Sequence, residues 1–222
     1  MATREKIKLT SYNELLDVNN DMISEIDINK LHQFKDHPFS VVDNEKMFEL
    51  AKSIENNGIL SPLLVRPLGN GEYEIISGHR RKRACEIVGK EKVSAIIKDI
   101  SHEEAIPLMV DANFQREDTL PSEKAKAYKM KMEALAHQGK SSDEMSSAKQ
   151  IGQLAGISDR QVQRYIRLTE LIPELSKLVD DKQITFVLGV EISFLKTEYQ
   201  QLIYENICKG KKVSKDNVRI IR

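Results

Sequence analysis

The chain has 222 residues, of which 40% are hydrophobic, and this is enough for one large domain or two small ones. Its 34 Lys and Arg residues are matched by 34 Asp and Glu residues, so any contact with nucleic acid or a nucleotide must come from a local patch rather than from bulk charge. Aromatic residues make up only 5% and Trp is absent, which argues against stacking platforms for single-stranded nucleic acid.

The two cysteines, Cys85 and Cys208, lie far apart and form no CxxC or Cys/His cluster. This favours buried free thiols in a reducing cytoplasm over a disulfide. The N-terminal sequence has no apolar signal segment, and no run of the chain approaches membrane-spanning length. These features predict a cytoplasmic protein with no membrane partner.

A first compact region is expected at 26–120, after a loosely ordered polar segment at 1–25. Residues 43–58 predict its first helix, because their apolar residues recur with helical spacing. Asp43 can cap the start of this helix, and Gly58 supplies its exit.

The rest of this region alternates strands with short helices. Two strands joined by a glycine-containing turn are predicted at 63–68 and 72–77. A helix is predicted at 79–89 and a strand at 92–100, and the sequence Ser-His-Glu-Glu at 101–104 is a capping box that starts a further helix. The order helix, strand, strand, helix, strand, helix predicts a small mixed α/β domain.

Helical patterns dominate the remainder of the chain. A long connecting helix is predicted at 121–137, with a proline near its first position. Residues 138–147 are polar and lack periodicity, which favours a linker. A helical domain is predicted at 148–208, followed by a basic tail at 209–222. The predicted fold class is therefore α+β, a mixed domain followed by an all-α domain.

Residues 147–171 have the layout of a helix-turn-helix. Leu154 is expected to face inward on the first helix, Gly156 permits a tight turn, and Ser158 caps a second helix whose inward positions include Val162. Arg and Gln dominate the opposite face, and these residues reach guanine and adenine edges in the major groove. The candidate DNA-binding residues are Lys149, Ser158, Arg160, Gln161, Gln163, Arg164 and Arg167.

The alternative is an ordinary helical hairpin with a solvated cationic face. The glycine turn, the helix cap and the Arg/Gln face agree with one another, and this agreement favours double-stranded DNA as the partner.

Four cations, residues 80–83, follow Gly78 at a predicted strand-to-helix junction. Cations near a helix N-terminus oppose the helix dipole, at roughly a few tenths of a kcal/mol each. A bound phosphate removes this conflict, because the free N–H groups of a helix start also attract anions. The alternative is a solvated basic helix end.

A second polar cluster consists of Asn113, Gln115 and Arg116, at the end of an apolar helix. Asn and Gln carry amide donors suited to phosphate or ribose oxygens, and Arg adds a planar fork. Taken alone, this cluster favours simple capping of the helix end. The presence of two such clusters in one small domain favours a polyphosphate ligand.

Four segments occur in a characteristic order: "ENNGILSPLLVRP", "ISGHRRKRA", "NFQREDTLPSEKAKAY" and "QIGQLAGISDRQVQRYIRL". Together they resemble the motifs of the ParB/RepB partition family, over about 26–195. "SYNELL", "KDHPF" and "RLTELIPEL" further resemble members carried on plasmids and mobile elements of Gram-positive bacteria. The resemblance implies an N-terminal domain that binds CTP, a helix-turn-helix that binds a centromere-like site, a homodimer that closes as a clamp on DNA, and a partition ATPase as partner.

The same resemblance assigns the nucleotide site. The glycine of the second segment and the arginines after it would hold the phosphates, and residues 58–66 would lie beside the base. The nucleotide-binding residues implied in this way are Gly58, Ser61, Pro62, Ser77, Gly78, His79, Arg80, Arg81, Asn113, Gln115 and Arg116.

The chain departs from the family pattern at two positions. His79 stands where the family has Glu, and Ala112 stands where it has the Glu that precedes the asparagine. Since Mg²⁺ prefers carboxylate oxygen, we expect nucleotide binding with slow hydrolysis, and the metal requirement stays open. The chain also ends soon after the helical region, where many members carry a dimerisation domain, so either dimerisation uses other surfaces or the chain is shortened.

Two other functions remain open from the sequence. A transcriptional regulator of a mobile element would need the same DNA contacts. A slow nucleotide hydrolase or phosphoryl-transfer enzyme would use the related fold of sulfiredoxin, whose motif has a Cys before the His-Arg pair, whereas this chain has Gly78 there.

Overall fold

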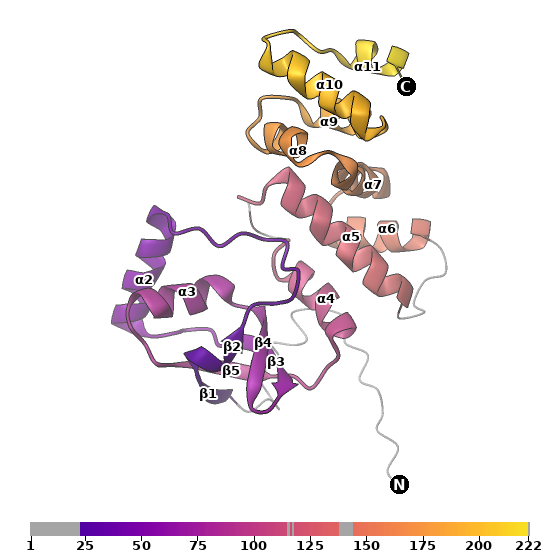
Figure 1. Cartoon of the computed structure of the whole chain (residues 1–222). Helices are drawn as coiled ribbons and strands as arrows, with labels where there is room; N and C mark the ends of the chain where they lie inside the picture. The colour runs from indigo at the N-terminus through magenta and orange to yellow at the C-terminus, as the bar shows by residue number, and fades with distance from the viewer. Residues whose placement is uncertain (1–22, 115, 117, 138–143, 222) are drawn as a thin grey trace. The chain divides into compact units, whose positions relative to one another are not determined.

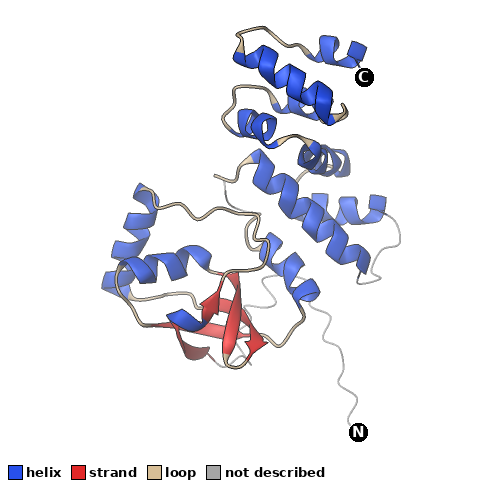
Figure 2. Ribbon diagram, in the orientation of Figure 1, coloured by secondary structure: helices blue, strands red, loops and turns tan. Residues whose placement is uncertain are grey.

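The computed structural model describes residues 23–114, 116, 118–137 and 144–221. Two compact units divide the chain between Asn113 and Phe114 (Figure 1). All described strands belong to the first unit, whereas the second is helical (Figure 2). The predicted fold class is confirmed: a mixed sheet domain is followed by a series of helices.

The first unit is built on a five-stranded sheet with the order β1-β5-β3-β4-β2. β3 runs antiparallel to β4 and parallel to β5, β1 is antiparallel to β5, and β2 is parallel to β4. The strands are β1 (Ile23–Asp27), β2 (Leu31–His32), β3 (Leu63–Gly69), β4 (Glu72–Ser77) and β5 (Lys92–Ile97), with a short 3-10 helix η1 (Ile28–Lys30) between the first two.

The described residues of this unit also form the helices α2 (Glu45–Asn57), α3 (His79–Ile87) and α4 (His102–Asp111). α2 packs against α3, and α4 packs against β4. The core joins sheet and helices through fully buried side chains such as Met47, Leu63 and Ile75. The predicted turn between β3 and β4 is present, and Asn70 and Gly71 both take the positive φ that a tight hairpin requires.

Two local predictions for this unit are wrong. Asn44, not Asp43, caps α2, because its side-chain oxygen accepts the Met47 N–H at 3.1 Å. Residues 23–25, expected to be loosely ordered, form part of β1, which is held by pairing with β5. The rest of the predicted N-terminal segment, 1–22, lies outside the described residues.

The described helices of the second unit pack around two apolar cores. The helices around the first core are α5 (Pro121–His137), α6 (Glu144–Ala155) and α7 (Asp159–Arg167). The elements of the second core are η2 (Leu168–Glu170), α8 (Pro173–Asp180), α9 (Phe186–Ile192), α10 (Thr197–Cys208) and α11 (Lys215–Ile221).

The structure corrects three predicted boundaries here. The connecting helix is part of the second unit, since Tyr128 and Leu135 of α5 pack against α6 and α7. Residues 144–147 of the predicted linker begin α6, and 138–143 lie outside the described residues. The basic tail contains α11, whose Val218 is 1% exposed in the second core.

Cleavage at a protease site inserted between 138 and 143 is therefore not expected to release two separate domains. α5 buries its apolar face against α6 and α7, so the C-terminal fragment should remain bound to α5 under native conditions. Size-exclusion chromatography of the cleaved protein would check this. Two peaks without denaturant would contradict the assignment of α5 to the second unit.

Two further observations bear on the sequence expectations. Cys85 is buried, as expected, whereas Cys208 is exposed at the end of α10, so the prediction of burial is wrong for Cys208. Among the residues that the structure describes, no helix is long and apolar enough to cross a membrane.

Candidate nucleotide and nucleic-acid sites

Glycine is required where β4 passes into α3. Gly78 caps α3 with φ +110°, a backbone conformation that residues with a side chain rarely adopt. A Cβ atom there would also lie 2.7 Å from the Cγ atom of Leu63 and 3.3 Å from a guanidinium nitrogen of Arg81. The backbone after the buried Ser77 is thus held close to β3.

Gly78→Ala is expected to destabilise the fold more than Gly71→Ala. Both positions have positive φ, which costs a side chain roughly 1–2 kcal/mol. A Cβ at Gly71 would meet nothing within 4 Å, whereas one at Gly78 would overlap Leu63, and such overpacking adds about 1–3 kcal/mol. Urea unfolding of both variants measures the difference, and equal losses would show that the close approach to Leu63 costs nothing.

The four cations after Gly78 have different surroundings. Lys82 pairs with Glu86 at 2.8 Å. Arg83 donates to Asp43, with an Nε–Oδ1 distance of 3.0 Å, and this hydrogen bond lowers the pKa of that carboxyl. The side chain of Arg80, by contrast, makes no hydrogen bond or ion pair with any other described residue. With respect to the described residues, the Arg80 guanidinium is therefore available for a ligand.

Arg81 joins two of the predicted nucleotide-binding segments. Its guanidinium donates to the carbonyl oxygen of Ser61 and, at 2.7 Å, to that of Pro62. Gly58, which ends α2 with φ +71°, lies at the start of the same loop. The structure thus brings the loop at 58–62 to the start of α3, with Arg81 as the connection.

The side chain of His79 holds a neighbouring segment against α3. Its Nε2 atom accepts the backbone N–H of Phe34 at 3.4 Å, and its ring centroid lies 3.8 Å from that of His37. His37 in turn donates from Nδ1 to the carbonyl oxygen of Phe39 at 2.7 Å. Because a backbone N–H can only donate, the Nε2 atom of His79 is the acceptor in this contact.

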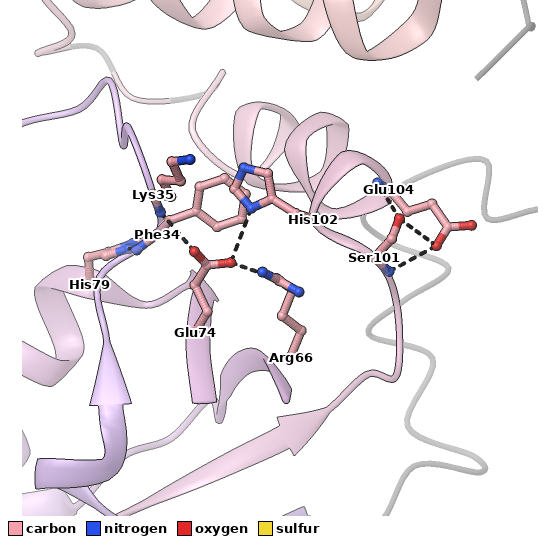
Figure 3. Close-up of polar contacts among 8 residues, drawn as sticks. All are labelled: Phe34, Lys35, Arg66, Glu74, His79, Ser101, His102 and Glu104. Carbon is pink, nitrogen blue, oxygen red and sulfur yellow. Dashed lines mark hydrogen bonds and ion pairs between the residues drawn. The ribbon is translucent and has the colours of Figure 1, made fainter. Parts of the chain in front are cut away.

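A buried carboxylate lies beside this segment (Figure 3). Glu74 of β4 is 4% exposed and accepts hydrogen bonds from the Lys35 backbone N–H at 2.9 Å, from Arg66 Nε at 2.5 Å and from His102 Nδ1 at 3.3 Å. Phe34 stacks on His102 with ring centroids 4.7 Å apart. Glu74 therefore ties the segment after β2 to β3, β4 and α4.

Burial alone would raise the pKa of Glu74, but the three hydrogen bonds outweigh it and hold the pKa below its ordinary value. The sequence analysis missed this residue. In an alternating strand, Glu74 lies on the opposite face from Tyr73 and Ile75, and a carboxylate there is usually expected to face solvent. Two of its three hydrogen bonds come from Lys35 and His102, which are distant in the sequence.

The second predicted cluster is only partly described. Asn113 donates from its side chain to the carbonyl oxygen of Met109 at 2.8 Å, which is the helix-capping role that the sequence left open. Gln115 lies outside the described residues. The carbonyl oxygen of Arg116 accepts the Thr119 hydroxyl at 3.0 Å. Asn113 ends the first unit and Arg116 belongs to the second.

The described part of the first unit shows neither a metal cluster nor a reactive cysteine. Within the described ranges, no three His, Cys, Asp or Glu side chains are grouped to hold a metal ion. Burial raises the pKa of the Cys85 thiol, and a buried neutral thiol is a poor nucleophile.

The predicted helix-turn-helix corresponds to α6 and α7. Gly156 turns with φ +68°, and the Ser158 hydroxyl accepts the Gln161 N–H at 3.1 Å as the cap of α7. Gly152 was missed by the sequence analysis: a Cβ there would lie 2.6 Å from the Ile157 carbonyl oxygen, so this glycine permits a close turn. A glycine inside a helical pattern is the signal that indicates such an approach.

One inward prediction for α6 is wrong. Leu154 is 49% exposed, whereas Ile151 and Val162 are buried as expected in the core with Tyr128. Ala155, the next residue, is partly buried against that core, so Leu154 is turned outward by the helical rotation.

The candidate DNA-binding residues fall into two groups. Lys149, Ser158, Arg160 and Gln163 are exposed, whereas Gln161, Arg164 and Arg167 are half-buried. Arg164 donates to the Gln161 side chain at 3.3 Å, and Arg167 donates to the Ser193 carbonyl oxygen at 2.6 Å. Arg167 is therefore engaged within its own unit, which favours a structural role for this residue.

Comparison with known proteins fits this arrangement. Residues 12–114 match the family of the ParB N-terminal domain. The chromosome-partitioning protein Spo0J of Thermus thermophilus is 38% identical over 141 residues, which cover 64% of this chain and 48% of that protein. A nucleoid occlusion protein of Listeria monocytogenes is 29% identical over 199 residues, covering 90% of this chain and 66% of that protein.

The fold also resembles a solved structure. A C-terminally truncated chromosome-partitioning protein ParB from Caulobacter crescentus, complexed to the centromeric parS site, aligns with a TM-score of 0.55 and 24% identity, over 89% of this chain and 97% of that one. The described fold, a mixed sheet domain followed by helices, is thus similar to the fold of that structure. It spans about half to two thirds of the length of the two curated relatives described above.

Proposed function

We propose that this chain is a sequence-specific DNA-binding protein of the ParB type, in which α7 enters the major groove of double-stranded DNA. The observation that carries this proposal is the α6–α7 pair, with α7 capped by Ser158 and presenting Arg160 and Gln163 to solvent. An Arg/Gln face on the second helix of such a pair suits base edges and phosphates. The parS complex of the C. crescentus relative supports the same assignment.

The first unit is proposed to bind CTP at the junction of β4 and α3. Gly78 and the start of α3, where no side chain caps the helix, suit a phosphate, and the Arg80 side chain makes no hydrogen bond or ion pair with the described residues. The choice of CTP rests on the family resemblance of the motifs. Mg²⁺, if used, would be held through phosphate oxygens and water, and we expect slow hydrolysis because His79 and Ala112 replace carboxylates.

The remaining proposals concern the biological setting. The relative named for chromosome partitioning favours DNA segregation. A homodimer and a partition ATPase are proposed as partners on the motif resemblance. The setting of a plasmid or mobile element rests on the motif resemblance alone. A transcriptional regulator would use the same DNA contacts, and loss of plasmid inheritance without change of transcription in a deletion strain would favour segregation.

A DNA selection experiment tests the central proposal. The full chain would be used to select duplexes from a randomised library, and affinities for the selected and unrelated duplexes would be compared at fixed salt. We expect the selected duplex to bind at least a thousandfold more tightly, with affinity falling steeply as salt rises. Equal affinity for all duplexes would rule out sequence-specific binding.

A further inference from the structure

Two arginines of α7 lie on aromatic rings that flank α9. The guanidinium carbon of Arg164 is 5.3 Å from the ring centre of Phe186, the first residue of α9. The guanidinium carbon of Arg167 is 4.4 Å from the ring centre of Phe194, which follows the end of α9. Both distances are within the range of cation–π attraction, so each end of α9 holds one arginine of the proposed reading helix.

The Phe186 ring is itself fixed by its neighbours. It packs against Tyr165 of α7 with ring centroids 4.7 Å apart, and Tyr165 packs against Tyr128 of α5 at 5.5 Å, nearly edge to face. Thr185 caps α9, because its hydroxyl accepts the Leu188 N–H at 3.2 Å. The ring under Arg164 thus packs against α7, and the Tyr165 ring that it contacts packs in turn against α5.

Polar contacts complete the arrangement. The Gln161 side chain accepts a hydrogen bond from Arg164 at 3.3 Å. An arginine side chain carries about 2 kcal/mol of rotamer entropy, and a side chain already held in place loses less of it on binding. Arg164 remains half-buried rather than enclosed, so its guanidinium is both oriented and accessible.

Arg160 provides a contrast on the same helix. It lies in the first turn of α7 and is exposed, and no aromatic contact is found for it among the described residues. A mobile exposed cation suits a phosphate, whose position tolerates variation, whereas base reading requires fixed geometry. The surroundings of Arg164 therefore suit base reading, whereas those of Arg160 suit phosphate binding.

We propose that Phe186 is a positioning residue that fixes Arg164 for reading base edges, so that α9 sets the sequence discrimination of α7 more than its total affinity for DNA. This inference rests on the proposed function. Leucine has similar bulk but no ring quadrupole, whereas tyrosine keeps the ring. The three side chains therefore distinguish positioning by the ring from simple packing.

The experiment measures the full chain and its Phe186→Leu variant on the selected duplex and on duplexes with one changed base pair. We expect Phe186→Leu to lower the ratio of these affinities about fivefold, while affinity for unrelated DNA and the salt dependence stay unchanged. Phe186→Tyr should restore the ratio. Tyr199→Leu, which removes an exposed ring from α10 of the same unit, should leave all values unchanged.

A second variant covers the case in which Phe186→Leu fails to fold, as judged by circular dichroism. Arg164→Lys leaves the ring in place but removes the planar guanidinium, and it should lower the same ratio. Unchanged discrimination in a folded Phe186→Leu protein would overturn the inference while leaving the proposed function intact. Unchanged discrimination in Arg164→Lys would overturn the inference and also count against Arg164 as a reader of base edges. A wild-type chain that prefers no duplex would overturn both.

Discussion

Glu74→Gln is expected to lower the free energy of unfolding by about 3–5 kcal/mol, since removal of one partner leaves a buried charge uncompensated. The partner is Arg66, whose side chain is 14% exposed and whose Nε atom lies 2.5 Å from the Glu74 carboxylate. Glutamine can still accept the Lys35 N–H, but it carries no charge to balance the guanidinium. Urea unfolding monitored by circular dichroism measures the loss.

Glu72→Gln is the matched control on the same strand. Glu72 pairs with His32, and both side chains are largely exposed, so this exposed pair contributes at most about 1 kcal/mol. Similar losses of unfolding free energy for the two variants would show that burial of Glu74 does not strengthen the contribution of its ion pair.

The pH dependence of unfolding gives a second readout for Glu74. Because its pKa is lowered in the folded state, the unfolded chain binds more protons in the acidic range. The stabilisation by Glu74 should therefore be fully present above the unfolded pKa of about 4.3 and be lost as the pH falls through the lower folded pKa. The difference between wild type and Glu74→Gln should shrink over that range.

Arg80→Ala is expected to weaken CTP binding by up to about a hundredfold, because a charge-assisted hydrogen bond contributes about 1.5–3 kcal/mol. The side chain is half-buried at a helix start and makes no hydrogen bond or ion pair with other described residues, so the fold should survive its loss. Isothermal titration calorimetry with CTP, in the presence of DNA, measures the change.

Arg83→Ala is the control for this prediction. Its guanidinium is already bound to Asp43 and Glu86, so CTP affinity should change little. Equal losses for the two variants would indicate a general effect of positive charge rather than a site at Arg80. No heat from any nucleotide with the folded wild-type chain would refute the nucleotide site altogether.

Local signals in the sequence predicted many of the elements correctly. The capping box at Ser101 and the cap at Ser158 both form, with the Glu104 N–H 3.2 Å from the Ser101 hydroxyl. Gly58 ends α2 and Gly156 makes the turn before α7. These features depend on hydrogen bonds within a few residues, which is why a linear pattern indicates them.

Features that depend on distant partners were not predicted. β1 is held by β5, far along the chain, and its own sequence shows no strong alternation. Asp43 forms an ion pair with Arg83, and this distant contact helps to decide which cation after Gly78 remains available. The sequence placed Val218 in a basic tail. Its burial comes from the packing of α11 against α9, which the local sequence does not show. Tertiary packing decides such cases, and the local pattern does not contain it.

Arg164→Ala tests most directly whether α7 reads base edges. On the selected duplex we expect binding weaker by about 1–3 kcal/mol, with little change on unrelated DNA. Lys149→Ala, which removes an exposed cation from α6, should instead weaken binding to all sequences alike and reduce the salt slope by about one. If Arg164→Ala binds the selected duplex as tightly as the wild type does, Arg164 is not a reader and the proposed interface is wrong.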